Sequence, residues 1–94
     1  MIWKAEVRVM LKPSVNDPQG LSIRGALHSL GFSGVQEVRA GKLIQVQLEA
    51  ESRTAAEAQV ERMCTQLLAN PVIETYAFAV DALAPEVVPG RSPG

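Results

Sequence analysis

The residues of this sequence that could do chemistry are few and widely spaced. There is one histidine, His28, and one cysteine, Cys64. His28 is followed by Ser29, but no sequence pattern supplies the nucleophile or carboxylate that catalysis by His28 would need. Cys64 falls on the apolar stripe of a predicted helix, where buried thiols are common. A reactive thiolate needs a cationic neighbour or a helix N-terminus, whereas Cys64 is expected near a C-terminal end. We interpret His28 as a surface or boundary residue and Cys64 as a core residue, and we expect no metal site, since zinc uses about four ligands.

Two groups of charged side chains are close enough along the chain to form a site. Glu57 and Glu61 are one helical turn apart, a spacing that more often gives a solvated helix face than a carboxylate pair. Arg39 and Lys42 flank Gly41, and two cations around a glycine can hold an anion, although the same charges also keep a turn in water. Phosphate-binding loops of the GxxxxGK[ST] or GxGxxG type do not occur. The sequence therefore predicts no catalytic residue on this chain.

Composition and charge narrow the class of protein. The chain has 94 residues, 47% of them hydrophobic and 20% charged, which indicates one small globular domain. Nine basic residues against ten acidic ones give a net charge of −1, so nucleic acid is not an expected partner. A single cysteine cannot form an internal disulfide, and neither a signal peptide nor a membrane span is evident. We expect a cytoplasmic protein without membrane contact.

The N-terminal half predicts a strand and then a helix. Apolar and charged residues alternate over residues 2–12, as in a half-buried strand. Asp17 and Pro18 have the features of a helix N-cap and first helical residue, and Gly31 is suited to the position after the helix. A β-hairpin is expected next, formed by residues 35–39 and 42–50 with Ala40-Gly41 as the turn.

The C-terminal half predicts a second helix and a last strand. Either Ser52 or Thr54 can cap the helix, whose apolar stripe ends at Leu67, and Asn70-Pro71 stops it. The strand at residues 72–80 is apolar on both faces. The order βαββαβ indicates a ferredoxin-like α+β sandwich, an antiparallel sheet with both helices on one face. We expect one domain over residues 1–83, and a flexible tail over 84–94 that is rich in proline and glycine.

Five short stretches in this order resemble the PurS family, the small subunit of phosphoribosylformylglycinamidine (FGAM) synthase. The resemblance covers residues 1 to about 81. It is carried by Leu11-Lys-Pro, Asp17-Pro-Gln-Gly20, Leu30-Gly-Phe32, Val38-Arg-Ala-Gly-Lys42 and Leu67-Leu-Ala-Asn-Pro-Val-Ile-Glu74.

The resemblance implies a non-catalytic subunit of a ligase in de novo purine biosynthesis. Such chains bridge a large, PurL-like synthetase subunit and a PurQ-like glutaminase subunit, and they assist ammonia transfer between the two. The whole complex converts formylglycinamide ribonucleotide, ATP, glutamine and water into FGAM, ADP, phosphate and glutamate. The resemblance implies that ATP and Mg²⁺ are used by the complex, and that this chain binds no cofactor. It also implies a dimer. Independently, the two apolar faces of residues 72–80 predict self-association through this strand, as a dimer or a tetramer.

The residues give three site hypotheses and two alternative functions. Partner or anion contact is assigned to Arg39, Gly41 and Lys42. An oligomer interface is assigned to Tyr76, Phe78 and Val80, and a structural role to Asp17, Pro18, Gly20, Asn70 and Pro71. The alternatives are a dimeric regulatory module of the same fold that binds a small molecule, and a stand-alone enzyme. Dimer stabilisation by a ligand would identify the first, and turnover by the isolated chain would identify the second.

Overall fold

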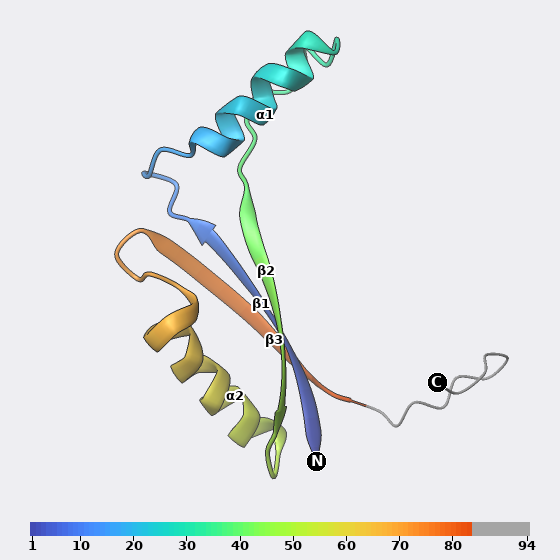
Figure 1. The fold of residues 1–94 in the computed structure, drawn as a ribbon, viewed down its shortest axis with the longest axis vertical. Coiled ribbons are helices and arrows are strands. Elements are labelled where there is room, and N and C mark those ends of the chain that lie inside the picture. Colours follow the sequence, from blue (N-terminus) through green and yellow to red (C-terminus); the bar gives the residue numbers. More distant parts are fainter. Residues whose placement is uncertain (84–94) are drawn as a thin grey trace, which may run out of the picture.

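The first strand lies at the centre of the sheet. A computed structural model describes residues 1–83, and in it β1 (Ile2–Leu11) pairs antiparallel with both β2 (Gly41–Glu49) and β3 (Glu74–Ala82). The sheet order is therefore β2-β1-β3 (Figure 1). The antiparallel, ferredoxin-like α+β class is confirmed, and the predicted tail lies outside the described residues.

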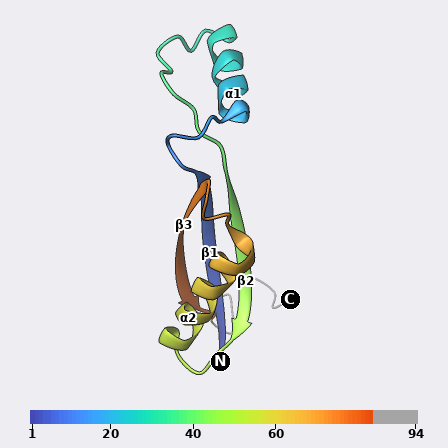
Figure 2. The ribbon, with the colours of Figure 1, turned by 90° about the vertical axis from the view of Figure 1, so that its left-hand side faces the viewer.

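One face of this sheet carries the hydrophobic core, and α2 (Arg53–Met63) covers that face (Figure 2). Every second residue of β1 is buried beneath the helix, as the alternating pattern predicts. The register places Val7 between Ile44 of β2 and Phe78 of β3, so all three strands contribute side chains to one layer. The buried core includes Trp3, Ala5, Val7, Val9 and Val80 from the strands, and Ala56, Val60 and Cys64 from the helical layer.

The second helix begins at a serine cap and ends in a π-helical turn. Ser52 is the N-cap, and its hydroxyl accepts from the Ala55 N–H at 3.1 Å. The helix continues as the π-helical segment η1 (Cys64–Leu68). A π turn has a wider hydrogen-bond ring than an α turn, so it rotates the side chains that follow. Leu67 is consequently 82% exposed, and Leu68 packs against the core in its place, which corrects the predicted apolar stripe.

The predicted strand at residues 35–39 does not form, so the expected hairpin is wrong. This segment instead runs beside α1 (Pro18–Ser29), whose side chains bind carbonyl groups that a neighbouring strand would use. The Nε of Arg24 donates to the Gln36 carbonyl at 2.9 Å, and the Nε2 of His28 lies 2.7 Å from the Val35 carbonyl oxygen. The sheet therefore has three strands, and β2 begins at Gly41.

The helix α1 does not share a face of the sheet with α2, contrary to the prediction. It projects beyond the end of the sheet (Figures 1 and 2). The cause is the connection: β1 and β2 are antiparallel neighbours, so the chain between them leaves and re-enters the sheet at the same end. The predicted helix ends are confirmed, with Asp17 as N-cap, Pro18 as first residue and Gly31 at a φ of 100°.

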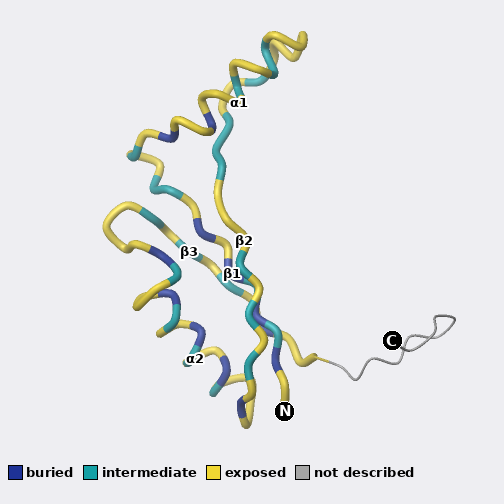
Figure 3. Tube along the Cα trace, viewed as in Figure 1, coloured by how far each residue is buried: buried dark blue, intermediate teal, exposed yellow. Residues whose placement is uncertain are grey.

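The surface of α1 is mostly exposed (Figure 3), including several large apolar side chains. These lie on the helix and on the turn that follows it: Leu21, Ile23, Leu30 and Phe32. A helix that is exposed in this way lacks the tertiary packing that normally stabilises helices in proteins. We refer to residues 18–34 as the arm, and to residues 12–17 and 35–40, which join it to the sheet, as the neck.

Candidate functional site

A groove of about 490 Å³ lies at the neck, between the first half of α1 and the two connecting segments. Its charged lining is mixed in sign, with Asp17 and Glu37 against Arg24 and Arg39. A site for phosphate or carboxylate would be expected to gather cations. Because acidic and basic side chains both line the groove, it is not a ready-made anion site. The contacts among its own residues describe it better.

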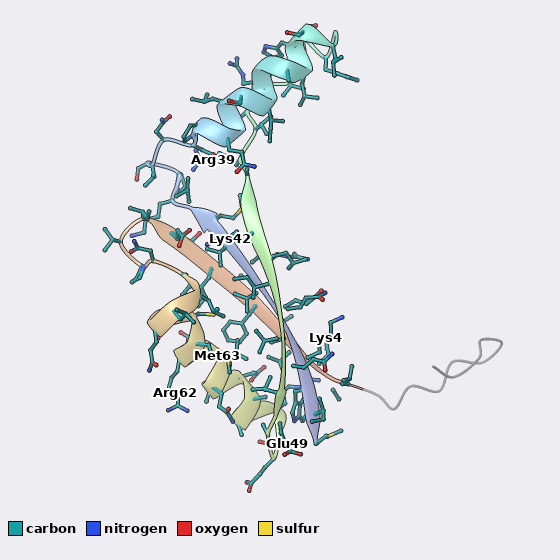
Figure 4. All side chains as sticks on the ribbon, viewed as in Figure 1. Lys4, Arg39, Lys42, Glu49, Arg62 and Met63 are labelled. Carbon is teal, nitrogen blue, oxygen red and sulfur yellow. The ribbon has the colours of Figure 1, made fainter. Side chains whose placement is uncertain are left out.

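Arg39 does not project from a hairpin tip but bonds to the neighbouring backbone. Its guanidinium donates to the Lys12 carbonyl at 2.9 Å, to the Leu11 carbonyl at 3.3 Å and to the Val15 carbonyl at 3.4 Å. The side chain lies at the neck (Figure 4). The expected pairing of Arg39 with Lys42 at one exposed turn is wrong, because the turn does not exist.

Gly41 and Lys42 belong to the sheet. Gly41 faces Met10 of β1, and a Cβ at this position would overlap the Val9 carbonyl oxygen and the Met10 side chain, so close strand approach explains the glycine. Lys42 extends from β2, with its Nζ 3.8 Å from a carboxylate oxygen of Glu74 on β3 (Figure 4). Such a partly exposed pair contributes about 0–1 kcal/mol. Contact of Arg39, Gly41 or Lys42 with a partner stays a prediction.

Asp17 joins the two sides of the neck. One carboxylate oxygen accepts from the Gly20 N–H at 3.0 Å, which is the predicted cap, and the other accepts from the Ala40 N–H at 2.8 Å. The side chain is buried, with the residue only 5% exposed. The hydrogen bonds from Ala40 and Gly20, with a smaller contribution from Arg39, hold the pKa of the Asp17 carboxyl below its ordinary value of 3.8.

Gly20 allows the helix to approach the returning chain. A Cβ at Gly20 would overlap the Val38 carbonyl oxygen and come within 2.8 Å of the Asp17 carboxylate. Pro18 occupies the first helical turn, where its missing N–H costs nothing. The structural interpretation of Asp17, Pro18 and Gly20 agrees with these contacts.

Asn70 and Pro71 shape the turn between the helical layer and β3. The Asn70 side-chain oxygen accepts from the Val72 N–H at 3.0 Å, and its backbone carbonyl accepts from the Glu74 N–H at 2.7 Å. Pro71 stands directly after Asn70, beyond the last helical residue, Leu68. This turn sets where β3 begins.

The three residues assigned to an oligomer interface lie on the face of β3 beneath α2. Val80 is buried, and Tyr76 and Phe78 are half-buried against the core. The Tyr76 hydroxyl donates to the Glu61 carboxylate at 2.8 Å, and this bond raises the pKa of the tyrosine. These side chains serve the packing of the single chain, and their role in an interface stays a prediction.

His28 and Cys64 occupy structural positions. His28 holds the returning segment as described above, and Cys64 is fully buried, where burial and the nearby Glu61 raise the pKa of its thiol. A raised pKa keeps a thiol protonated and unreactive. Within residues 1–83, no cluster of three or more His, Cys, Asp or Glu residues could hold a metal ion.

Sequence reasoning found the cap at Asp17 but missed its second bond, to Ala40. It also missed the roles of Arg24 and His28 in holding residues 35 and 36. Neither spacing nor composition indicates such contacts, because they join segments far apart in the sequence. The nearest signal was the presence of the Asp17–Gly20 and Val38–Lys42 stretches in one chain.

Comparison with known proteins gives a consistent family. The family model described as PurS, phosphoribosylformylglycinamidine (FGAM) synthase, matches residues 4–82. The PurS subunit of FGAM synthase from Synechocystis is 45% identical over 87 residues, which are 93% of this chain and 87% of the relative. The corresponding subunit from Methanocaldococcus jannaschii is 42% identical and covers 87% of this chain and 99% of its own.

Solved structures agree with the sequence comparison. Thermus thermophilus PurS superimposes with a TM-score of 0.81 at 39% identity, over 89% of this chain and 100% of its own. A chain in the structure of PurLQS from Thermotoga maritima superimposes with a TM-score of 0.79 at 32% identity, over 85% of this chain and 98% of its own.

Two glycines of α1 provide a matched test of the neck geometry. Gly20→Ala forces a methyl group onto the Val38 carbonyl and should destabilise the fold by about 1–3 kcal/mol. Gly25→Ala, where nothing lies within 4 Å, should stabilise it by about 1 kcal/mol, because alanine favours the helix. Chemical denaturation followed by circular dichroism measures both. Equal effects of the two substitutions would contradict the close approach at Gly20.

The Asp17 carboxylate predicts an acid-sensitive neck. Because its pKa is lowered on folding, its contribution to stability is fully present above the unfolded value of 3.8 and disappears as the pH falls through the lower folded-state pKa. A nuclear magnetic resonance titration of the Ala40 and Gly20 amide shifts should therefore show a midpoint below 3.8. A midpoint at or above that value would show that the two backbone bonds do not favour the carboxylate.

Proposed function

The chain belongs to the PurS family of FGAM synthase subunits, and from this membership we propose that it bridges the synthetase and glutaminase subunits of that enzyme and assists ammonia transfer between them. The observation that carries the proposal is the match of the family over residues 4–82. The superposition on a chain in the PurLQS structure supports a place in such an assembly.

In the proposed role this chain supplies contact surface rather than chemistry. A PurQ-like subunit releases ammonia from glutamine, and a PurL-like subunit uses ATP and Mg²⁺ to join that ammonia to formylglycinamide ribonucleotide. Ammonia is mostly protonated in neutral water and is then not nucleophilic, so transfer benefits from a route that excludes water. Folded surfaces of a small subunit can close such a route without any catalytic residue.

The described residues suit contact of this kind. Three charged side chains that line the groove at the neck, those of Arg24, Arg39 and Asp17, bond to the chain's own backbone, and the lone thiol is buried. Neither α1 nor α2 has the length and apolar character that a membrane-spanning helix needs. We propose that the complex acts in the cytoplasm, where an unpaired cysteine such as Cys64 stays reduced.

We further propose that the chain self-associates. The outer edges of β2 and β3 pair with no other strand of residues 1–83, and open edges favour pairing between chains. The arm carries apolar side chains that the rest of residues 1–83 leaves exposed, including Leu30 and Phe32. A dimer or a tetramer would cover both kinds of surface.

Reconstitution tests the bridging role. Purified PurL-like and PurQ-like subunits from the same organism should form FGAM from glutamine only when this chain is added, while turnover with ammonium chloride should need the large subunit alone. The isolated chain should neither hydrolyse ATP nor release glutamate. Glutamine-dependent turnover at the same rate without the chain would contradict the proposal.

Sedimentation at micromolar concentration tests self-association, with a dimer or larger species expected. Substitution of Leu30 and Phe32 by serine should weaken the association, because burial of such side chains contributes about 1.5–3 kcal/mol each. Gln66→Ser, an exposed polar change on the helical layer, should leave it unchanged. A monomeric wild-type chain would exclude this part of the proposal.

A further inference from the structure

The arm joins the sheet only through the two segments of the neck. Within residues 1–83 α1 makes no extensive packing contact with any strand or with α2, and it stands clear of the sheet in both ribbon views. A helix carried on two connecting segments can pivot about their backbone torsions unless other bonds hold it. The neck contains such bonds, because each of its two segments carries a side chain that binds the backbone of the other segment.

The first contact is made by the Asp17 side chain on the outgoing segment, which accepts a hydrogen bond from the backbone of the returning segment. Asp17 has two oxygens in one plane, and one binds the Gly20 N–H of the first helical turn while the other binds the Ala40 N–H directly before β2. Hydrogen bonds to a charged acceptor are stronger than neutral ones, and these are shielded from water by the burial of Asp17. The carboxylate therefore fixes the start of α1 relative to the start of β2.

The second contact is made by the Arg39 side chain on the returning segment, which donates hydrogen bonds to backbone carbonyls of Leu11 and of the outgoing segment. The Arg39 guanidinium spans three carbonyls, at Leu11, Lys12 and Val15. Leu11 is the last residue of β1, so Arg39 ties the returning chain to the end of the central strand. A planar fork with several donors can hold this arrangement, whereas a lysine ammonium cannot reproduce its geometry.

These contacts bring together three stretches that sequence analysis singled out: Leu11-Lys-Pro, Asp17-Pro-Gln-Gly20 and Val38-Arg-Ala-Gly-Lys42. We infer that Asp17 and Arg39 are positioning residues that lock the arm in one direction relative to the sheet, so that its exposed apolar side chains meet the other chains of the assembly in a fixed orientation. The inference rests on the proposed function, since it assumes that assembly is what the arm serves.

Asp17→Asn separates this lock from helix capping. Asparagine is as good an N-cap as aspartate, so its oxygen retains the bond from Gly20, but its amide nitrogen would face the Ala40 N–H and cannot accept from it. Arg39→Lys keeps the charge and loses the three-carbonyl span. A charge contact with a partner would tolerate Arg39→Lys, whereas the lock would not.

Amide hydrogen exchange on the isolated chain gives the first readout. In Asp17→Asn the Ala40 amide should exchange roughly tenfold faster or more, while the amides of Gly20 and of Val7 in the sheet keep their wild-type rates. Emission from the buried Trp3 at the far end of β1 should be unchanged and reports that the core is folded. Wild-type exchange at Ala40 in this variant would overturn the inference.

Glutamine-dependent turnover of the reconstituted complex gives the second readout. Both Asp17→Asn and Arg39→Lys should lower it by about tenfold at limiting chain concentration, with partial recovery at high concentration as mass action forces assembly. Ser52→Ala is the matched control, since it removes a helix cap at the opposite end of the molecule, and it should leave turnover as in wild type. Turnover equal to wild type in both neck variants would overturn the inference alone. Failure of the wild-type chain to support turnover would overturn the proposed function and this inference with it.

Discussion

The central strand β1 satisfies its backbone hydrogen bonds between two partners, and this requirement shapes the rest of the molecule. It pairs with β2 along one edge and with β3 along the other, so its donors and acceptors are used within the sheet. The alternate side chains of β1 then face a single layer that has to be covered. The alanines Ala5 and Ala56, both fully buried, let α2 lie close to the strand and complete that layer.

The same pairing expels α1 from the sheet. Since β2 returns directly beside β1, the chain between them starts and finishes at one end of the sheet, and α1 is carried out beyond it. Side-chain bonds to backbone groups replace the packing that the arm lacks. Arg24 and His28 hold the returning segment against α1, while Asp17 and Arg39 hold the neck. Stability in this half of the chain depends on directed hydrogen bonds rather than on buried apolar area.

This division gives a physical account of the proposed role, in which the subunit supplies contact surface. The sheet and α2 form a core that one chain can complete, with Trp3 and Val80 buried in it. The arm instead exposes apolar side chains that need other surfaces. The charged side chains of Asp17 and Arg39 are engaged with the chain's own backbone, so the stretches that contain them maintain a shape. The proposed closing of a transfer route between two enzyme subunits needs such a shape more than it needs a reactive group.

The sequence by itself determined the elements whose signals are local. Alternation over residues 2–12 predicted β1, the Asp17-Pro18 pair and Gly31 predicted the ends of α1, and the five ordered stretches predicted the family. Only the tertiary structure decided what residues 35–39 do, because a short stretch such as Val-Gln-Glu-Val-Arg fits a strand unless helix side chains bind its carbonyl groups. It also decided that Arg39 faces the chain's own backbone and that Leu67 turns outward at η1. These outcomes depend on which distant segments meet, and residue types and their spacing along the chain do not contain that information.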